Sequence, residues 1–453
     1  MHHVSGSITL LFGALLVVMV LCLALEEKLH AKKSVIVGIA AVLALFLASA
    51  FGLVHRDPVT IMGHTVNLPI YIPGVDWEVI AIILGSSIFV DVTSKSGLFT
   101  WIAIKLTKAS RGDPLILLIF YGLMTIVFSA VLNNVTAMII VGTLSGVSLE
   151  KLGRMNKLLG FLLIEGLLTN VGGLLTLISS VPNIIVGNAA GISFVEFFLK
   201  ASPYVILATT ITIWMGGKVF GIERLATESE KADAQDKVAG FDEDDGLGSQ
   251  KFFWFGTIMT GLFILAMATA SITPYIRELG LGYVALAFAA IMLTCYKATA
   301  NRFYQAIDWD LLAFFGCLFI VINMMEHALV LEAIGEFVKP ILALGELAGP
   351  AVLLVVSAVA SSVTDNIPLA AMLAKILGSM NLSPDSPYWW AVIFGANLGG
   401  NITPIGSAST LVAVTLIHKF KIHLSFADFV KRAVPFALIQ LIFAAAYVLA
   451  FLR

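Results

Sequence analysis

The stretch Gly395-Ala-Asn-Leu-Gly-Gly-Asn-Ile-Thr-Pro-Ile-Gly-Ser-Ala-Ser-Thr410 decides the fold of this chain. It lies inside a segment apolar enough to cross a bilayer, yet it holds four glycines, a proline, two asparagines, two threonines and two serines. Irregular backbone at membrane depth is tolerated only where protein or water satisfies its polar groups, which excludes a lipid-facing helix. The stretch therefore predicts a discontinuous helix that lines a buried polar site.

A related stretch occurs earlier in the chain, as Asn170-Val-Gly-Gly-Leu-Leu-Thr-Leu-Ile-Ser-Ser-Val-Pro-Asn183. Its Asn170 and Thr176 correspond to Asn397 and Thr403 of the later stretch, both at an offset of 227 residues. Other pairs recur at an offset of 232: Trp77 with Trp309, Asn134 with Asn366, Ser193 with Ser425, Glu196 with Asp428, and Pro203 with Pro435. Because the matches fall on polar and proline positions, they favour an internal two-fold repeat over chance similarity between apolar segments. Interrupted segments at corresponding places in two halves indicate the substrate site of a transporter.

The composition is that of a polytopic membrane protein, with 59% hydrophobic residues, 12% charged residues and a mean hydropathy of +0.98. A net charge of −2 without a basic cluster argues against a nucleic-acid partner. The chain has no GxxxxGK[ST] phosphate loop and no paired base and nucleophile, so we expect neither an ATPase domain nor an enzyme. Its three cysteines show no CxxC spacing, and we expect no metal and no cofactor.

The fold class predicted from hydropathy is an all-α polytopic membrane protein. It has about ten transmembrane helices, two re-entrant hairpins whose polar tips lie deep in the membrane, and two interrupted helices. The first repeat covers 1–221, with a hairpin at 114–149 and an interrupted helix at 158–190; the second covers 252–453, with a hairpin at 349–379 and an interrupted helix at 389–417. The acidic segment 222–251 is expected to be a solvated cytoplasmic linker between the repeats.

The distribution of basic residues predicts the orientation in the membrane. Each half has five crossings besides its hairpin, and an odd number inverts the second half relative to the first. With the amino terminus outside, most of the 27 Lys and Arg residues fall on the inner side, as the positive-inside rule requires. We therefore expect a multi-pass protein of the cell inner (plasma) membrane with its amino terminus outside.

Two hairpin tips and two helix breaks are expected to converge on one site. Free N–H groups at half-helix ends favour anions, free carbonyls favour cations, and asparagine and hydroxyl side chains add further ligands. The alternative is that these polar groups only hold helices together, but that role would not need broken helices. The predicted substrate-binding residues are Asn133, Asn134, Thr136, Asn170, Gly172, Gly173, Thr176, Ser180, Asn183, Thr364, Asn366, Asn397, Gly399, Gly400, Asn401, Thr403 and Ser407.

Asp365, in the tip of the second hairpin, is the leading candidate for coupling transport to protons or cations. Its counterpart in the first tip is Asn133, and an acidic residue inside the membrane is a functional hypothesis by default. The alternative is a neutral, hydrogen-bonded structural acid. Glu165, on the first interrupted segment, is a second coupling candidate. No arginine lies on the broken segments or tips, which favours a small neutral solute or a monovalent cation over a dicarboxylate.

The motifs Val181-Pro-Asn-Ile-Ile-Val-Gly187, Asp365-Asn-Ile-Pro368 and Gly395–Ser407 resemble the ArsB/NhaD branch of the ion transporter superfamily. That branch includes arsenite efflux permeases, sodium/proton antiporters and the melanosomal P protein. The resemblance covers nearly the whole chain. It implies inverted repeats, scaffold and transport domains, elevator-type motion and a homodimer.

Within the branch, Ile402-Thr-Pro-Ile-Gly-Ser407 is most similar to the arsenite permeases, and the first-half proline–asparagine pair to the P-protein group. Where that group has glycine-aspartate, this chain has Ser179-Ser180-Val181, which weakens a sodium site. The resemblance implies a secondary transporter that exports arsenite or antimonite, coupled to protons. A Na+/H+ antiporter is the nearest alternative, and a channel-like or sensory membrane protein is the alternative of another class. The partners expected are the small substrate, H+ or Na+ and the lipid bilayer. Transport is driven by a gradient or by a separate soluble ATPase subunit, for which the acidic linker is the candidate docking segment.

Overall fold

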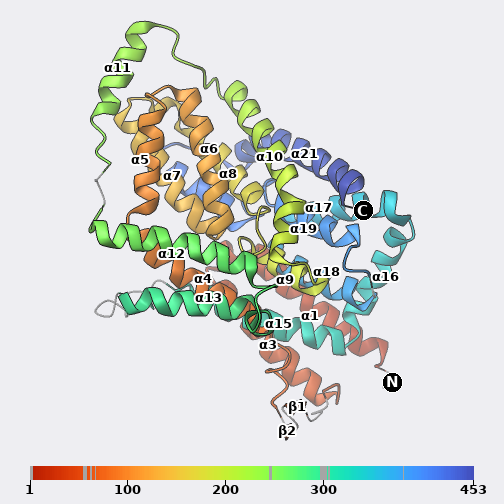
Figure 1. The fold of residues 1–453 in the computed structure, drawn as a ribbon. Helices are drawn as coiled ribbons and strands as arrows, with labels where there is room; N and C mark the ends of the chain where they lie inside the picture. Colours follow the sequence, from red (N-terminus) through yellow and green to blue (C-terminus); the bar gives the residue numbers. More distant parts are fainter. Residues whose placement is uncertain are drawn as a thin grey trace.

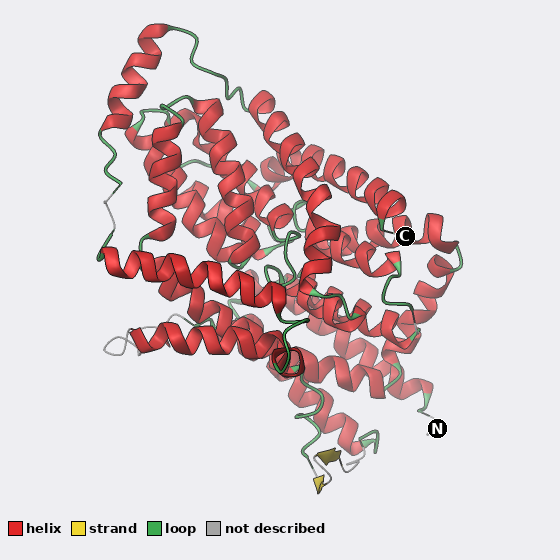
Figure 2. Ribbon diagram, in the orientation of Figure 1, coloured by secondary structure: helices red, strands yellow, loops and turns green. Residues whose placement is uncertain are grey.

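The chain folds almost entirely into helices in the computed structural model (Figure 2). The residues described are 4–54, 59–61, 64–66, 68–243, 247–295, 304, 307–380 and 382–452. Among them, ten helices are long and apolar enough to cross a membrane, which confirms the predicted all-helical, polytopic class. These ten include the first arm of each hairpin, whereas each interrupted crossing is split into two shorter helices.

The first half runs from α1 to α10. Its elements are α1 Gly6–Ala24, α2 Glu26–Leu29, α3 Lys33–Ala50, β1 Val59–Ile61, β2 His64–Val66, α4 Trp77–Lys95, α5 Leu98–Ala109, α6 Pro114–Val131, α7 Asn134–Lys151, η1 Met155–Lys157, α8 Leu158–Gly172, α9 Val181–Ala190 and α10 Phe194–Val219. The antiparallel pair β1–β2 lies in a segment predicted to be a loop, so the chain is not purely helical.

The linker holds α11 Glu228–Ala239, and the second half follows it with a similar order of helices. Its elements are α12 Gln250–Thr269, α13 Ile276–Cys295, α15 Trp309–His327, α16 Val330–Leu342, α17 Gly345–Val363, α18 Asn366–Ser379, α19 Pro387–Gly399, α20 Ala408–Lys419 and α21 Phe426–Phe451. The second interrupted segment thus starts two residues before its predicted boundary, because Pro387 occupies the first turn of α19, where proline is favoured.

The helices form two groups (Figure 1). In the lower part of the view, α1, α3, α4, α12, α13 and α15 lie together, and α3 packs on α15 while α13 packs on α4. Above them lie the hairpin α6–α7, the hairpin α17–α18, both interrupted segments, α10 and α21. Each half of the chain therefore contributes to both groups.

Corresponding helices in the two halves begin with the same contacts. The indole Nε1 of Trp77 donates to the carbonyl of Ile72 at 3.1 Å, and that of Trp309 donates to the carbonyl of Tyr304 at 2.8 Å. In each case the preceding aspartate caps the helix by accepting from its first-turn N–H groups. The internal repeat read from the sequence is thus repeated in local structure.

Glycines allow α19 to lie directly against the hairpin arm α17. A Cβ atom placed on Gly399 would overlap the carbonyl oxygen of Ala358, and one on Gly395 would overlap the carbonyl oxygen of Leu354. The two glycines are four residues apart and share one helix face. Small residues at such a spacing let helix backbones approach closely inside a membrane. Gly399, predicted as a substrate-binding residue, therefore has a packing contact that its sequence context did not reveal.

The linker contains a helix, α11, whose residues are mostly exposed. The Thr227 hydroxyl accepts from the N–H of Glu230, whose carboxylate in turn accepts from the backbone N–H of Thr227. This reciprocal capping box is visible in the sequence as Thr227-Glu-Ser-Glu230. The linker also contacts the first half, where Glu243 pairs with Lys105 and Lys108 on α5.

Candidate functional site

The two helix breaks meet side by side in the upper group of helices. Asn170, near the end of α8, donates from Nδ2 to Asn401 Oδ1 at 2.8 Å and to Ser407 Oγ at 2.9 Å. Ser409 Oγ in turn donates to Asn170 Oδ1 at 3.1 Å. The first break is therefore held to the second through one fully buried amide.

The reverse connection is made by a second asparagine. Asn397, the counterpart of Asn170, donates from Nδ2 to Asn183 Oδ1 at 2.9 Å and accepts from Ser180 Oγ at 2.7 Å. Each interrupted segment thus contributes one asparagine that hydrogen-bonds to the other segment, and both amides are fully buried. Since a buried polar group without a partner is costly, these mutual bonds hold the two breaks in a fixed arrangement.

A threonine in each break donates a hydrogen bond to a backbone carbonyl near the end of a hairpin arm. Thr176 Oγ1 donates to the carbonyl of Ala130 at 2.5 Å, near the end of α6. The corresponding Thr403 Oγ1 donates to the carbonyl of Ser362 at 2.5 Å, near the end of α17. The last carbonyls of a helix lack intrahelical partners, so these bonds fix each hairpin tip against a break.

Gln440 extends this network and was not identified from the sequence. It lies on α21, accepts from Asn401 Nδ2 at 2.8 Å and donates to Thr212 Oγ1 on α10 at 2.9 Å. The sequence feature that could have identified Gln440 is that it is the single amide side chain in an otherwise apolar final span, where a polar residue needs a hydrogen-bond partner.

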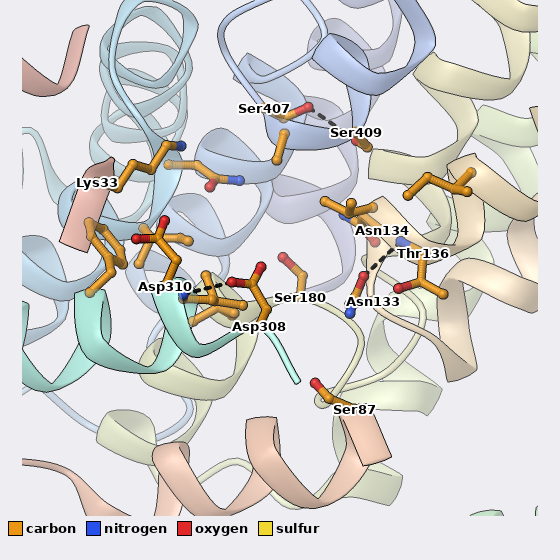
Figure 3. Close-up of a pocket in the computed structure, with 18 of the residues that line it drawn as sticks. Lys33, Ser87, Asn133, Asn134, Thr136, Ser180, Asp308, Asp310, Ser407 and Ser409 are labelled. Carbon is orange, nitrogen blue, oxygen red and sulfur yellow. Dashed lines mark hydrogen bonds between the residues drawn. The ribbon is translucent and has the colours of Figure 1, made fainter. Parts of the chain in front are cut away.

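A cavity of about 880 Å³ lies between the breaks and the lower group of helices (Figure 3). The first turns of α7, α9, α18 and α20 line it, as do those of α3 and α15. The predicted residues that line it are Asn133, Asn134, Thr136, Asn170, Ser180, Asn366 and Ser407. The amino termini of α7, α9, α18 and α20, which begin at the hairpin tips and the breaks, therefore face one space.

The remaining predicted residues are not among those that line the cavity. Gly172, Gly173, Thr176, Asn183, Asn397, Gly399, Gly400, Asn401 and Thr403 pack or hydrogen-bond around the breaks, and Thr364 and Asp365 lie at the second hairpin tip. Thr364 Oγ1 donates to the carbonyl of Ala360 in its own helix at 2.8 Å. Glu165 lies five residues before Asn170 on α8 and is fully buried.

Charged side chains line the other wall of the cavity, and the sequence reading did not assign them to the site. Lys33, the first residue of α3, and Asp308 and Asp310, at the start of α15, project into the view of Figure 3. Asp310 accepts a hydrogen bond from the Ser34 hydroxyl. Lys33 and the aspartates belong to helix ends in a different part of the sequence, so only the packing of α3 on α15 brings them to the breaks.

Asp365 is held by an ion pair. Its Oδ2 lies 2.5 Å from Lys33 Nζ, and its Oδ1 accepts from the N–H of Ile367 at 3.0 Å, which caps α18. Lys33 Nζ also lies 3.8 Å from Glu26 Oε1. The leading coupling candidate is therefore a partner of Lys33 in this arrangement, which neither sequence alternative included.

Comparison with solved structures identifies the same fold in another transporter. The chain matches the crystal structure of the Alcanivorax borkumensis YdaH transporter, whose title states that it reveals an unusual topology, with a TM-score of 0.59. The match covers 92% of this chain and 98% of that chain at 12% sequence identity. At that identity the likeness concerns the fold alone.

Sequence relatives are also membrane proteins. An uncharacterized transporter of Mycobacterium tuberculosis is 28% identical over 381 residues, covering 83% of this chain and 86% of the relative. A 46 kDa membrane protein of Mycobacterium leprae is 28% identical over 379 residues, with the same coverage. The human P protein is 25% identical over 500 residues, covering 91% of this chain but only 59% of the P protein.

The model of the CitMHS family, described as citrate transporter, matches residues 7–395. That range takes in both hairpins and the first break, and it ends within α19, before the second break. The narrower resemblance to arsenite permeases is not what this match identifies, although P protein is among the relatives. The chain thus belongs to the CitMHS family of the ion transporter superfamily and is a multi-pass membrane transporter, not an enzyme.

Proposed function

We propose that this protein is a gradient-driven carrier of small carboxylate anions, with citrate as the first substrate to test. The observation that carries the proposal is that the first turns of α7, α9, α18 and α20 all line one cavity. A helix amino terminus bears a partial positive charge and free N–H donors, and carriers use half-helix ends of this kind to hold anionic substrate groups. The family description supports the same substrate class.

Donors remain available in these first turns. Within the described chain, the backbone N–H groups of Val181, Ala408 and Ser409 make no hydrogen bond. The side chain of Ser180, at the cap of α9, does not bond to its own helix, and its hydroxyl donates to Asn397 instead. A carboxylate in the cavity would find these N–H groups together with neutral amides and hydroxyls.

Charged side chains also line the cavity. The absence of arginine from the breaks and tips argued against a dicarboxylate, but Lys33 reaches the cavity from α3. Lys33 is paired with Asp365, and Lys32 is the other lysine among the lining residues. The acids Glu26, Asp91, Asp308 and Asp310 line the cavity too, so the positive potential that faces a carboxylate comes mainly from the helix amino termini.

Arsenite or antimonite export is the second candidate. It is favoured by the neutral side chains of the deep site, where Asn170, Asn401 and Ser407 bond to one another without a charged partner. A neutral hydroxylated solute could exchange hydrogen bonds with such a set. The same cavity would serve a Na+/H+ antiporter, whereas a channel or sensor would need no alternation between the two sides.

The transport mechanism that we propose is elevator-type movement between inverted repeats. The helices α1, α3, α4, α12, α13 and α15 would form the scaffold, and the hairpins and interrupted helices the moving domain. In each of two contacts, α3 with α15 and α13 with α4, a helix of one half packs on a helix of the other half, which supports a two-fold relation. We further propose an inner-membrane location with the amino terminus outside and a homodimer. A soluble ATPase partner is an alternative source of energy for the same carrier.

The test uses purified protein in proteoliposomes with radiolabelled citrate, succinate and arsenite, each with and without a pH gradient. We expect saturable citrate uptake with competition by other small carboxylates. Arsenite movement without citrate movement would replace the first candidate by the second. A sodium-evoked change of internal pH with neither solute moving would identify an antiporter, and uptake at a rate that does not saturate would indicate a channel.

A further inference from the structure

Glu165 is a fully buried carboxyl group behind the cavity. Its Oε1 accepts a hydrogen bond from the Ser145 hydroxyl on α7. Its Oε2 has no hydrogen-bond partner in the part of the chain that the structure describes, and the group makes no ion pair there. The proposed carrier site uses neither oxygen.

The surroundings of Glu165 are apolar and closely packed. The next residue, Gly166, lies against Ala413 of α20, where an added Cβ would meet the Ala413 methyl at 2.8 Å. On α7, Gly142 lies against Leu416 and Leu162 in the same way. A carboxylate ion with an unpaired oxygen is strongly disfavoured in such a place, so the group is a neutral carboxylic acid in this arrangement.

Titratable neighbours do not neutralise a charge on Glu165. Tyr121 on α6 is near it, and the Tyr121 hydroxyl is already bonded to Ser148 and Thr107. On the helices α7, α10, α20 and α21, which pack against α8, the charged residues and His418 lie within the first seven or the last two residues, and none pairs with Glu165. They are Glu150, Lys151, Glu196, Lys200, Lys218, His418, Lys419, Asp428, Lys431 and Arg432. Nothing described therefore fixes this carboxyl in its ionised form.

Hydroxyl groups connect the neighbourhood of Glu165 to the end of the first hairpin. Tyr121 Oη lies 2.8 Å from Ser148 Oγ and 2.9 Å from Thr107 Oγ1. Ser148 and Ser145 are three residues apart on α7, a spacing that places them on one face. Thr107 lies in the last turn of α5, beside the basic end of that helix.

In the other direction, Glu165 is close to the cavity. Asn170 lines the cavity and follows Glu165 by five residues on the same helix, which is about 7.5 Å along the axis. At the offset that relates Asn170 to Asn397, the second half has the buried Val392. Only one half of the repeat therefore carries an acid at this depth.

We propose that Glu165 is the proton-binding site of the carrier, filled through the hydroxyls of Thr107, Tyr121, Ser148 and Ser145. This inference rests on the proposed carrier function. Binding adds one proton to a carboxylate oxygen, and release on the other side of the membrane returns the carboxylate, so no other bond is made or broken. Asp365 is not needed for this step because Lys33 neutralises it.

Two measurements in proteoliposomes separate the proton site from the carrier site. The first is citrate counterflow at equal pH on both sides, which requires no net proton movement. The second is net citrate accumulation driven by an imposed pH gradient. For Glu165→Gln we expect counterflow to persist and gradient-driven accumulation to be lost, since an amide replaces a neutral acid without taking up a proton. Glu150→Gln, an exposed acid on α7, is the matched control and should behave like the wild type.

The outcomes distinguish the two proposals. Gradient-driven accumulation by Glu165→Gln at the wild-type level would overturn the proton site and leave the carrier standing. A wild-type protein that fails both assays would instead contradict the proposed function. Because Glu165→Gln could impair folding, infrared difference spectra of the purified wild type are recorded as pH changes, without substrate. We expect a buried carboxylic C=O band that titrates and that Glu165→Asp shifts; a spectrum unchanged by Glu165→Asp would overturn the inference.

Discussion

The Lys33 ammonium and the Asp365 carboxylate lie 2.5 Å apart, joining the first residue of α3 to the tip of the second hairpin. The pair links the two groups of helices beside the cavity, which Lys33 lines. A neighbouring contact of this pair has a counterpart in the other half, but the ion pair itself has none. Asp310 accepts from Ser34, the residue after Lys33, and its counterpart Glu78 accepts from Leu281 N–H at 2.9 Å, the residue after Gly280.

Lys33 therefore corresponds to Gly280, and Asp365 corresponds to Asn133. If the halves exchange roles when the carrier alternates, the opposite state has no equivalent ion pair. The pair then stabilises only the arrangement seen here. This is a different role from the proton relay expected for Asp365 from the sequence.

We predict that Lys33→Ala and Asp365→Asn shift the carrier away from this arrangement to the same extent. A partly buried ion pair of about 1 kcal/mol corresponds to roughly a fivefold change in the equilibrium. The measurement is maleimide labelling of Thr136→Cys in the cavity, in a protein whose three native cysteines are replaced by serine. The single variants should change the rate of labelling, and the exchanged pair, Lys33→Asp with Asp365→Lys, should return it to the rate of the parent protein. Such a return is incompatible with Asp365 acting only as a proton carrier.

The bond between the two breaks should be measurable as a coupling energy. We predict that Asn170→Ala and Asn401→Ala each destabilise the protein by about 1–3 kcal/mol, because each leaves a buried amide without its partner. In the double mutant the losses should fall short of their sum. Thermal unfolding in detergent provides the measurement, with the exposed Asn156→Ala as control. Strict additivity would mean that the 2.8 Å contact contributes nothing.

Close packing of α19 on α17 leads to a third prediction. Gly399→Ala should destabilise the protein by about 1–3 kcal/mol, because the new methyl overlaps the carbonyl of Ala358 in a packed core. Gly316→Ala is the matched control on α15, since a Cβ there meets nothing within 4 Å. It should be neutral or slightly stabilising through helix propensity. Equal unfolding temperatures for the two variants would show that α17 and α19 separate easily.

The contact between the linker and α5 should depend on pH. Hydrogen bonds from Lys105 and Lys108 lower the pKa of Glu243 below its ordinary value of 4.5. The contact is therefore fully present above that ordinary value and is lost as pH falls through the lowered one. We predict that acidification, or Glu243→Gln at neutral pH, increases proteolytic cleavage within 222–251. Asp236→Asn, at an exposed residue of α11 that makes no described ion pair, should leave cleavage unchanged.

The helical membrane class could be read from the sequence, and the two glycine-rich stretches lie where α8 and α19 end in the structure. Hydropathy marks the spans because backbone polar groups must be satisfied inside a bilayer, and that leaves long apolar helices as the main solution. Glycine, proline and asparagine inside such spans then locate the breaks, since they are unfavourable there without a compensating contact. The capping box at Thr227 is visible in the sequence too, although the prediction for the linker was only that it is a solvated connector.

Only the tertiary structure decided which polar groups share a site. The local sequence pattern does not encode that Asn170 bonds to Asn401 or that the Thr176 hydroxyl donates to the carbonyl of Ala130, because those partners are distant in sequence. The packing of α3 on α15 brings Lys33 to Asp365 and brings Lys33, Asp308 and Asp310, which the sequence did not assign to the site, to the cavity. Sequence periodicity determines which face of a helix is buried, whereas the choice of neighbour depends on shape and hydrogen bonding across the whole fold.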